Sequence, residues 1–370
     1  MATANERLSD ESLAHAIWVS RYSTGVASRM VKLLNESDAE LTARLLVAMD
    51  TLDADSFTVS RLESLLVSVR ALNHDAVQSM YAGLSTELQE LAQHEAGYQM
   101  SLFQFAIPDD VLALHPLVGI SPDAVYAAAM AQPFQGRLLS EWADNLEADR
   151  MTRISNTVRQ GFLLGDTHEQ IARKVRGHAN RGYQDGALQI SRANAASIAK
   201  TAVGHLAATA RDQFAQSNDD IIKARQQLST LDNRTSSQCR VRDRLKWTLD
   251  KKPIGHKIPY LQGAGRLHFC CRSTETYVLK SSEELGIKVG EIKDSSRASM
   301  DGQVPADSNY QEWFSRQSFT RQSQIVGVTR ARLIRDGGMS ADEFYNDRGE
   351  WLTLEQLRER DEQAFRGAGI

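Results

Sequence analysis

Cysteine is scarce in this chain of 370 residues, and its three cysteines, Cys239, Cys270 and Cys271, lie close together. In a reducing compartment, so few cysteines argue against a disulfide-stabilised framework. Long hydrophobic runs are also missing: no stretch of about 18 apolar residues occurs, so we expect no transmembrane helix. The N-terminus has no basic segment followed by an apolar one and does not look like a signal peptide. These absences predict a protein that is made and kept in the cytoplasm.

Recognisable catalytic and nucleotide-binding motifs are absent too. The sequence contains no P-loop, no dinucleotide-binding fingerprint and no pattern typical of a catalytic triad. It has no internal repeat and no low-complexity tract. Its 42% hydrophobic and 24% charged residues are typical of a folded protein with two or three domains.

Charge is unevenly distributed along the chain. Residues 1–150 carry 9 Lys and Arg against 21 Asp and Glu, residues 151–280 carry 22 against 10, and residues 281–370 carry 12 against 16. This distribution predicts an acidic domain over 1–150, a basic domain over 151–280, and a connection with a C-terminal tail over 281–370. The basic segment either faces nucleic acid or an acidic protein, or docks on the acidic segment of its own chain.

Hydrophobic periodicity predicts a mainly helical fold. Apolar residues recur at helical spacing through the first 150 residues and again in a long alanine-rich segment over 186–215. Capping-box patterns at Ser37, Ser60 and Thr167 predict helix starts. After residue 220, glycine, proline and short β-prone segments predict a small irregular α+β unit. The predicted fold class is therefore predominantly α, with a small α+β unit that a metal ion would pin.

That unit contains a candidate metal site. Cys239, His268 and Cys271 supply thiolate and imidazole, which suit Zn²⁺. Zinc normally takes four ligands, and the candidates for the fourth are Cys270, His256, Asp243 and Asp232. Three alternatives remain open: reduced cysteines that merely pack, a disulfide formed outside the cell, and a catalytic Cys–His pair.

The same segment is rich in cations. The candidate contacts to DNA or to an acidic partner are Arg240, Arg242, Arg244, Lys246, Lys251, Lys252 and Lys257. A solvated basic loop and internal ion pairs, such as Asp232 with Arg234 or Asp243 with Arg272, are the alternatives.

The segment as a whole resembles the signature of the phage Mu F-like head morphogenesis family. That signature has a Thr-Leu-Asp-x-Arg-Thr opening, then a Cys, an Asp and an aromatic residue, and a closing His-x-x-Cys-Arg. The matching residues are Thr230, Leu231, Asp232, Arg234, Thr235, Cys239, Asp243, Trp247, His268, Cys271 and Arg272. The resemblance covers about residues 150–360. Many relatives have two further cysteines, at the positions of Ser236 and Ser273, and a glutamate at the position of Ala202.

The resemblance implies a minor head protein that is not an enzyme. Such proteins associate with the portal and with other head, capsid or scaffold proteins, and some are thought to associate with double-stranded DNA and to affect its packaging or ejection. The chain would then be found in the host cytoplasm during assembly and in the virion afterwards, with no membrane partner. Two other functions remain open: an enzyme, such as a transferase or nuclease, on this scaffold, and a free zinc-dependent nucleic-acid-binding protein.

Overall fold

The computed structural model describes residues 3–50, 59–281, 283–285, 296–299, 302–305 and 308–370. The structure is 65% helical and contains a small four-stranded antiparallel sheet, which confirms the predicted fold class. Within these described ranges, no helix is both long enough and apolar enough to span a membrane.

The chain forms two compact units, each assembled from separate segments. The sheet unit comprises Met1–Val19, His94–Ser121 and Ala207–Ile370, and the helical unit comprises Ser20–Gln93 and Pro122–Leu206. These boundaries do not coincide with the divisions at 150 and 280 that charge suggested. Three long helices each contribute residues to both units, so segments distant in sequence share a unit.

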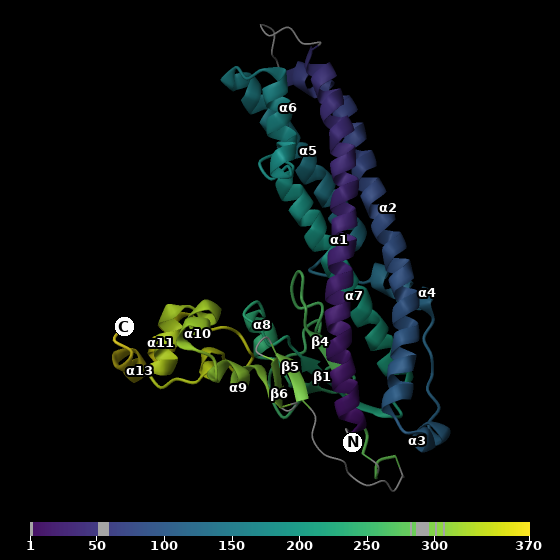
Figure 1. Ribbon diagram of the computed structural model, residues 1–370, viewed down its shortest axis with the longest axis vertical. Helices are drawn as coiled ribbons and strands as arrows, with labels where there is room; N and C mark the ends of the chain where they lie inside the picture. Colours follow the sequence, from purple (N-terminus) through teal and green to yellow (C-terminus); the bar gives the residue numbers. More distant parts are fainter. Residues whose placement is uncertain (1–2, 51–58, 282, 286–295, 300–301, 306–307) are drawn as a thin grey trace. The chain divides into compact units, whose positions relative to one another are not determined.

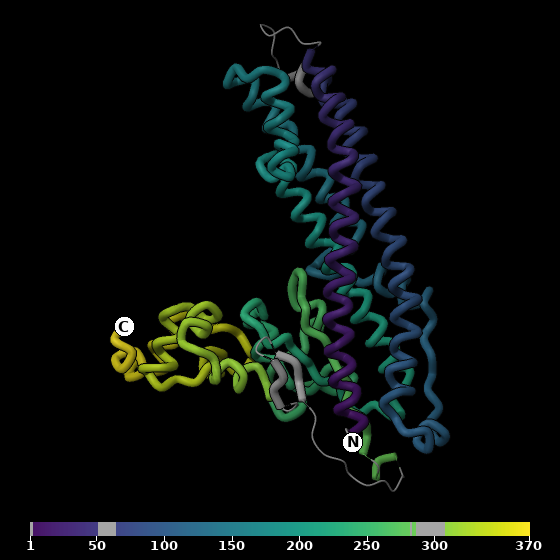
Figure 2. Tube along the Cα trace, in the orientation of Figure 1, coloured from purple at the N-terminus to yellow at the C-terminus, as the bar shows by residue number. Residues whose placement is uncertain are grey.

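Two of these long helices, α1 (Ala4–Asp50) and α2 (Val59–Ala106), run antiparallel and side by side (Figures 1 and 2). Tyr22 Oη donates to Glu87 Oε2 at 3.0 Å, and Tyr98 Oη donates to the backbone oxygen of Glu11 at 3.1 Å. The helix start predicted at Ser37 is wrong, because α1 continues through it. The Ser37 hydroxyl donates to the backbone oxygen one turn earlier instead of capping a helix. The helix start predicted at Ser60 involves side chains that lie outside the described residues.

The helical unit packs further helices against this pair. They are α4 (Pro122–Ala131), α5 (Leu139–Leu164), α6 (His168–Arg176), the 3-10 helix η2 (Ala179–Arg181) and most of α7 (Gln189–Ser217). Thr167 caps α6 as predicted, since its hydroxyl accepts from the Gln170 amide. The core joins four helices through Leu45 of α1, Leu66 of α2, Ile154 of α5 and further apolar residues of α6.

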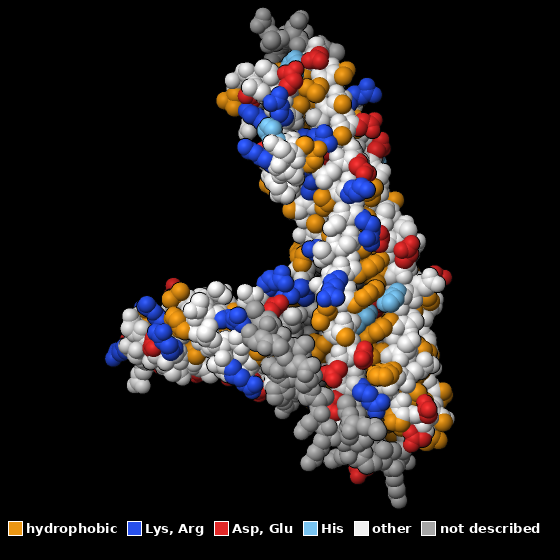
Figure 3. Space-filling view, viewed as in Figure 1, with side chains coloured by type: hydrophobic (Ala, Val, Ile, Leu, Met, Phe, Trp, Pro, Cys, Tyr) orange, Lys and Arg blue, Asp and Glu red, His pale blue; other side chains and the backbone are white. Residues whose placement is uncertain are grey.

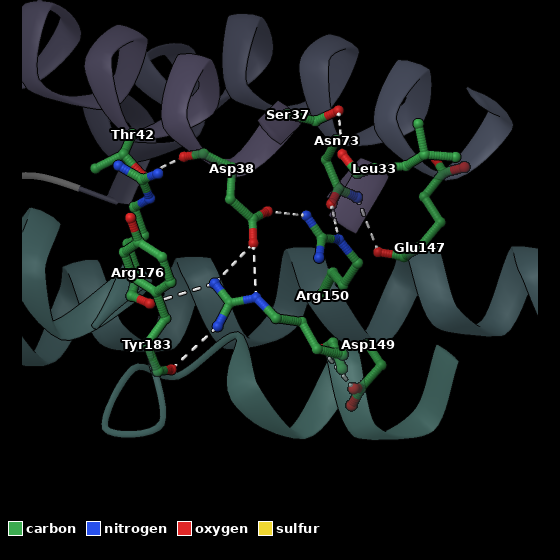
Figure 4. Close-up of polar contacts among 12 residues, drawn as sticks. Leu33, Ser37, Asp38, Thr42, Asn73, Glu147, Asp149, Arg150, Arg176 and Tyr183 are labelled. Carbon is green, nitrogen blue, oxygen red and sulfur yellow. Dashed lines mark hydrogen bonds and ion pairs between the residues drawn. The ribbon is translucent and has the colours of Figure 1, made fainter. Parts of the chain in front are cut away.

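A charged network lies inside this apolar core (Figure 4). Asp38 Oδ1 accepts from Arg150 Nη2 at 2.5 Å, and Asp38 Oδ2 accepts from Arg192 Nη2 at 2.8 Å. Asn73 accepts from Arg150 Nε and donates to the backbone oxygen of Glu147. The Asp38 and Arg150 side chains are fully buried, so α1, α2, α5 and α7 are joined by polar contacts shielded from water.

The sheet unit is organised around strand β1 (Ile222–Leu228). The other strands of its sheet are β2 (Lys246–Trp247), β3 (Pro253–Ile254) and β4 (Thr274–Leu279), in the order β3-β2-β1-β4. Strands β5 (Ser296–Ser299) and β6 (Gly302–Pro305) form a separate antiparallel pair. Strands β2 and β4 confirm that short β-prone segments occur after residue 220. Strand β1, the central one, was not predicted.

Short helices complete the sheet unit. They are α3 (Asp109–Leu114), α8 (Ser237–Arg240), α9 (Tyr310–Ser315), α10 (Phe319–Val326), α11 (Val328–Arg335), the 3-10 helix η3 (Ala341–Phe344), α12 (Leu354–Arg360) and α13 (Glu362–Gly367). The helices after α8 share one hydrophobic cluster that includes Trp313, Phe344 and Leu357. Leu231, from the loop after β1, also belongs to this cluster, which ties the C-terminal helices to the sheet.

Candidate metal centre

The two cysteines and the histidine of the predicted metal site come together in the sheet unit. Cys239 Sγ lies 3.3 Å from His268 Nε2 and 3.6 Å from Cys271 Sγ. Two thiolates bound to one tetrahedral Zn²⁺ with bonds near 2.3 Å are roughly 3.8 Å apart, and a thiolate and an imidazole nitrogen are about 3.5 Å apart. The donor types and their spacing therefore fit a zinc ion.

Local backbone structure positions each of the three side chains. Ser236 caps α8, and Cys239 follows in its first turn. His268 and Cys271 lie in a turn before β4, closed by a 3.2 Å hydrogen bond from the Cys271 amide to the His268 carbonyl. Cys270 has a φ of 55° in this turn, a left-handed conformation that costs roughly 1–2 kcal/mol for a non-glycine residue. This turn leaves Cys270 exposed while its neighbour Cys271 joins the cluster.

The hydrogen bonds around the cluster favour a thiolate at Cys271, and the bond between Cys271 and His268 raises the pKa of His268. The bond with Cys271, together with burial, raises the pKa of the Cys239 thiol. The bond from Cys239, helped by His268, holds the pKa of Cys271 well below its usual value although burial opposes this. His268 Nδ1 lies 2.9 Å from the Phe269 carbonyl, which can only accept, so Nδ1 carries a proton and Nε2 faces the sulfur atoms.

Three of the four candidates for a fourth ligand are engaged elsewhere, and the fourth is exposed. Asp232 pairs with Arg272, and Asp243 accepts from the backbone amides of Ser229 and Tyr310. His256 Nε2 faces the Lys246 carbonyl, and Cys270 is exposed. Among the described residues, the group of metal-ligand side chains that includes Cys239 has three members. A bound ion would thus keep one coordination position for water or another small ligand.

Two serines border the cluster, and both were noted in the sequence as positions where relatives have cysteine. Ser236 Oγ lies 2.8 Å from His268 Nε2. The Ser273 side chain hydrogen-bonds the Cys239 thiol. The two positions at which relatives have cysteine therefore lie beside Cys239 and His268.

The other motif residues stabilise the loops around the cluster. Arg272 forms two hydrogen bonds with the Asp232 carboxylate, at 2.7 and 2.8 Å, so it is Asp232 rather than Asp243 that pairs with it. Although burial opposes it, this contact lowers the pKa of Asp232. Thr235 donates to the Thr230 carbonyl. The remaining three motif residues are Arg234, which is exposed, Trp247, which is buried and donates to the Ile258 carbonyl, and Asp243, described above.

The candidate basic contacts divide into two groups. Lys246, Lys251, Lys252 and Lys257 are exposed, as a surface for an acidic partner requires. Arg242 is only 2% exposed and donates to the carbonyls of Gln238 and Pro259, so the prediction that it contacts a partner is wrong. Arg240 lies 5.3 Å from the ring of Trp351, and Arg244 is half-buried near Ser9.

A buried ion network beside the sheet was not predicted. Arg225, in the middle of β1, is fully buried and contacts Asp212 and Glu275, while Arg266 also pairs with Asp212. Tyr260 donates to Glu275 Oε1 at 2.7 Å. The sequence gives little sign of this network, because Arg225 lies between Ala224 and Gln226 in a strand that was not predicted.

Fold and cluster together define a mainly helical protein with a three-ligand Cys/His centre attached to a small antiparallel sheet. Comparisons with protein-family models, with curated proteins and with solved structures gave no match.

Proposed function

We propose that this chain is a minor head protein of a tailed phage, of the Mu F-like kind, which associates with the portal during head assembly and remains in the virion. The proposal rests mainly on one observation. Residues matched to the family signature lie in two segments, 230–247 and 268–272, and these segments meet around the Cys239 cluster. The two serine positions at which relatives have cysteine border the same cluster.

The contacts of these residues support a structural role rather than catalysis. Asp243 receives two backbone amides, Asp232 holds Arg272, and Trp247 is buried against the sheet. Each side chain is used to hold loop segments together. A rigid loop surface built in this way suits stable binding to another protein.

DNA is a candidate second partner of the same unit. The four exposed lysines of the segment lie within twelve positions, on and after β2. Contacts with phosphate make binding salt-dependent, and each lost contact reduces the slope of log K against log salt by roughly one. Lys251→Glu with Lys252→Glu is therefore expected to weaken DNA binding and to flatten its salt dependence.

The test of the main proposal is complex formation with the portal protein encoded beside this chain. Both proteins are mixed and the assembly is measured by native mass spectrometry, which also reports any bound metal. We expect a stoichiometric complex that survives Arg234→Ala, a surface change, and is weakened by Asp232→Ala, which unpairs Arg272.

A metal-bearing monomer that binds no portal protein would overturn the proposal. DNA binding by that monomer would favour the free nucleic-acid-binding alternative. Turnover of a substrate that is lost in Cys239→Ala would favour the enzyme.

A further inference from the structure

A second group of metal-ligand side chains lies in the sheet unit, far along the chain from the cysteines. His15 comes from α1, and His94 and Glu95 come from α2. One ligand atom from each lies within 4.8 Å of the others. Figure 3 shows histidine side chains at the surface over this pair of helices, beside a group of hydrophobic ones.

The carboxylate of Glu95 is buried without the hydrogen-bond donors that a buried charge needs. The residue is 0% exposed, and His15 is 6% exposed. His15 Nε2 is 3.0 Å from Glu95 Oε1, close enough for an ion pair but not aligned as a hydrogen bond. Among the described residues, neither Glu95 oxygen has a hydrogen-bond donor. One turn further along α2, Gln99 is 1% exposed and both of its amide atoms also lack partners among these residues.

Buried polar atoms almost always have partners, since leaving one unsatisfied costs about 1–3 kcal/mol and more for a charge. Several such atoms side by side indicate that something else completes the site. A cation next to Glu95 and His15 satisfies the carboxylate and the imidazole nitrogen together.

Aromatic stacking holds both imidazole rings in place. The His15 ring stacks on Tyr98 with centroids 3.7 Å apart, and the His94 ring stacks on Trp18 at 4.3 Å. Rings held in this way lose little freedom when they bind an ion. His94 is exposed, so it gives the ion a route from solvent and leaves space for a water ligand.

We propose that His15, His94 and Glu95 bind a divalent transition-metal ion of the Zn²⁺ class, independently of the Cys239 cluster. Two imidazoles and one carboxylate are a donor set that suits zinc and its neighbours. Calcium and magnesium prefer more oxygen ligands than this group offers. The ion would join α1 to α2 in the sheet unit.

Cobalt(II) distinguishes this site from the cysteine cluster in the full chain. Cobalt bound to thiolate gives strong charge-transfer absorption in the near ultraviolet, whereas cobalt bound to nitrogen and oxygen gives only weak visible bands. The chain is stripped with chelator and titrated with Co²⁺, and native mass spectrometry counts the ions. In the Cys239→Ser background we expect one remaining ion with the weak visible bands alone.

His94→Ala and Glu95→Gln should each weaken this binding by at least about tenfold. Even the loss of a residue that only hydrogen-bonds a metal ligand weakens metal affinity by about this factor. His94 is exposed, so its replacement tests the site without disturbing the core. His115→Ala, another histidine of the same unit, is the matched control and should leave the titration unchanged. The proposal is wrong if Cys239→Ser binds no cobalt, or if adding His94→Ala or Glu95→Gln to Cys239→Ser leaves the cobalt affinity unchanged. The site is then a buried His–Glu ion pair.

Discussion

Replacing Asp38 with alanine should destabilise the helical unit more than almost any other single change on α1. Asp38 is fully buried and accepts hydrogen bonds from Arg150 and from two nitrogens of Arg192. Removing it leaves two guanidinium groups without their shared counter-charge inside an apolar core. Breaking a buried pair on one side costs about 3–5 kcal/mol. This is a large part of the roughly 5–15 kcal/mol that stabilises a typical domain.

Urea unfolding followed by circular dichroism measures this loss, and α1 provides its own control. Glu36 lies two residues from Asp38 and pairs with Lys32 at 3.8 Å, but these two side chains are 62% and 77% exposed. An exposed pair at this spacing contributes about 0.3–0.5 kcal/mol. Glu36→Ala should therefore shift the urea midpoint only slightly, whereas Asp38→Ala should shift it by several times as much.

A third variant separates unpaired charge from lost packing. When Asp38→Ala is combined with Arg150→Met and Arg192→Met, no unpaired charge remains, and apolar replacements of buried ion networks are often neutral or stabilising. We expect the triple variant to recover much of the stability lost in Asp38→Ala. The reasoning is refuted if Asp38→Ala is no less stable than Glu36→Ala, or if the triple variant is less stable than Asp38→Ala alone.

Four further predictions concern other parts of the chain. Gly161→Ala should lower stability by about 1–3 kcal/mol, because its Cβ would lie 2.4 Å from Ile171 Cγ1. Gly97→Ala should raise stability by about 0.5–1 kcal/mol in the same melting assay, because within the described residues the added Cβ has nothing within 4 Å apart from its chain neighbours and the nearby backbone of its own helix. Burial opposes ionisation of Asp212, but its two arginine partners outweigh this and hold the pKa of Asp212 below its usual value. The stabilisation that Asp212 contributes is therefore present above about pH 4 and is lost as pH falls through the lower folded pKa. Asp212→Asn should make the free energy of unfolding depend less on pH in the acid range. Chelator should lower the melting temperature of the wild type more than that of Cys239→Ser, and the difference should be the equivalent of about 2.7 kcal/mol when metal had been at 100 times its Kd. An equal effect of chelator on both proteins would show that the cysteines only pack.

Local sequence signals predicted helices well but misplaced some of their ends. The capping box at Thr167 begins a helix, as predicted. The same pattern at Ser37 does not, because the apolar stripe of α1 continues on both sides of it, with no glycine or proline between Val26 and Asp50. A Ser-x-x-Glu pattern caps a helix only where the chain leaves helical geometry, and four residues do not specify that.

The buried charges were missed for a related reason. Arg150 lies between Leu146 and Ile154 at the four-residue spacing of one helix face, and all three are buried. A lone charge in such a stripe is a signal that a partner exists, but the sequence does not show which residue supplies it. Asp38 is 112 positions away from Arg150 and was identifiable only once the fold brought α1 and α5 together.

The cysteine cluster was predictable because its residues follow a motif with the spacing of metal ligands. The loops that carry these residues need other contacts to keep their shape. Strands β2 and β3 have two residues each, so they contribute few ladder hydrogen bonds to the loops around Cys239. The bonds from Arg272 to Asp232 and from the Tyr310 amide to Asp243 supply directional contacts that hydrophobic packing does not. It follows that Asp232→Ala should increase amide hydrogen exchange in these loops while leaving exchange in the helical unit unchanged, because Asp232 belongs to the sheet unit alone. Equal protection in both proteins would mean that the loops are held by packing, and the role given to this ion pair in binding a partner would then be wrong.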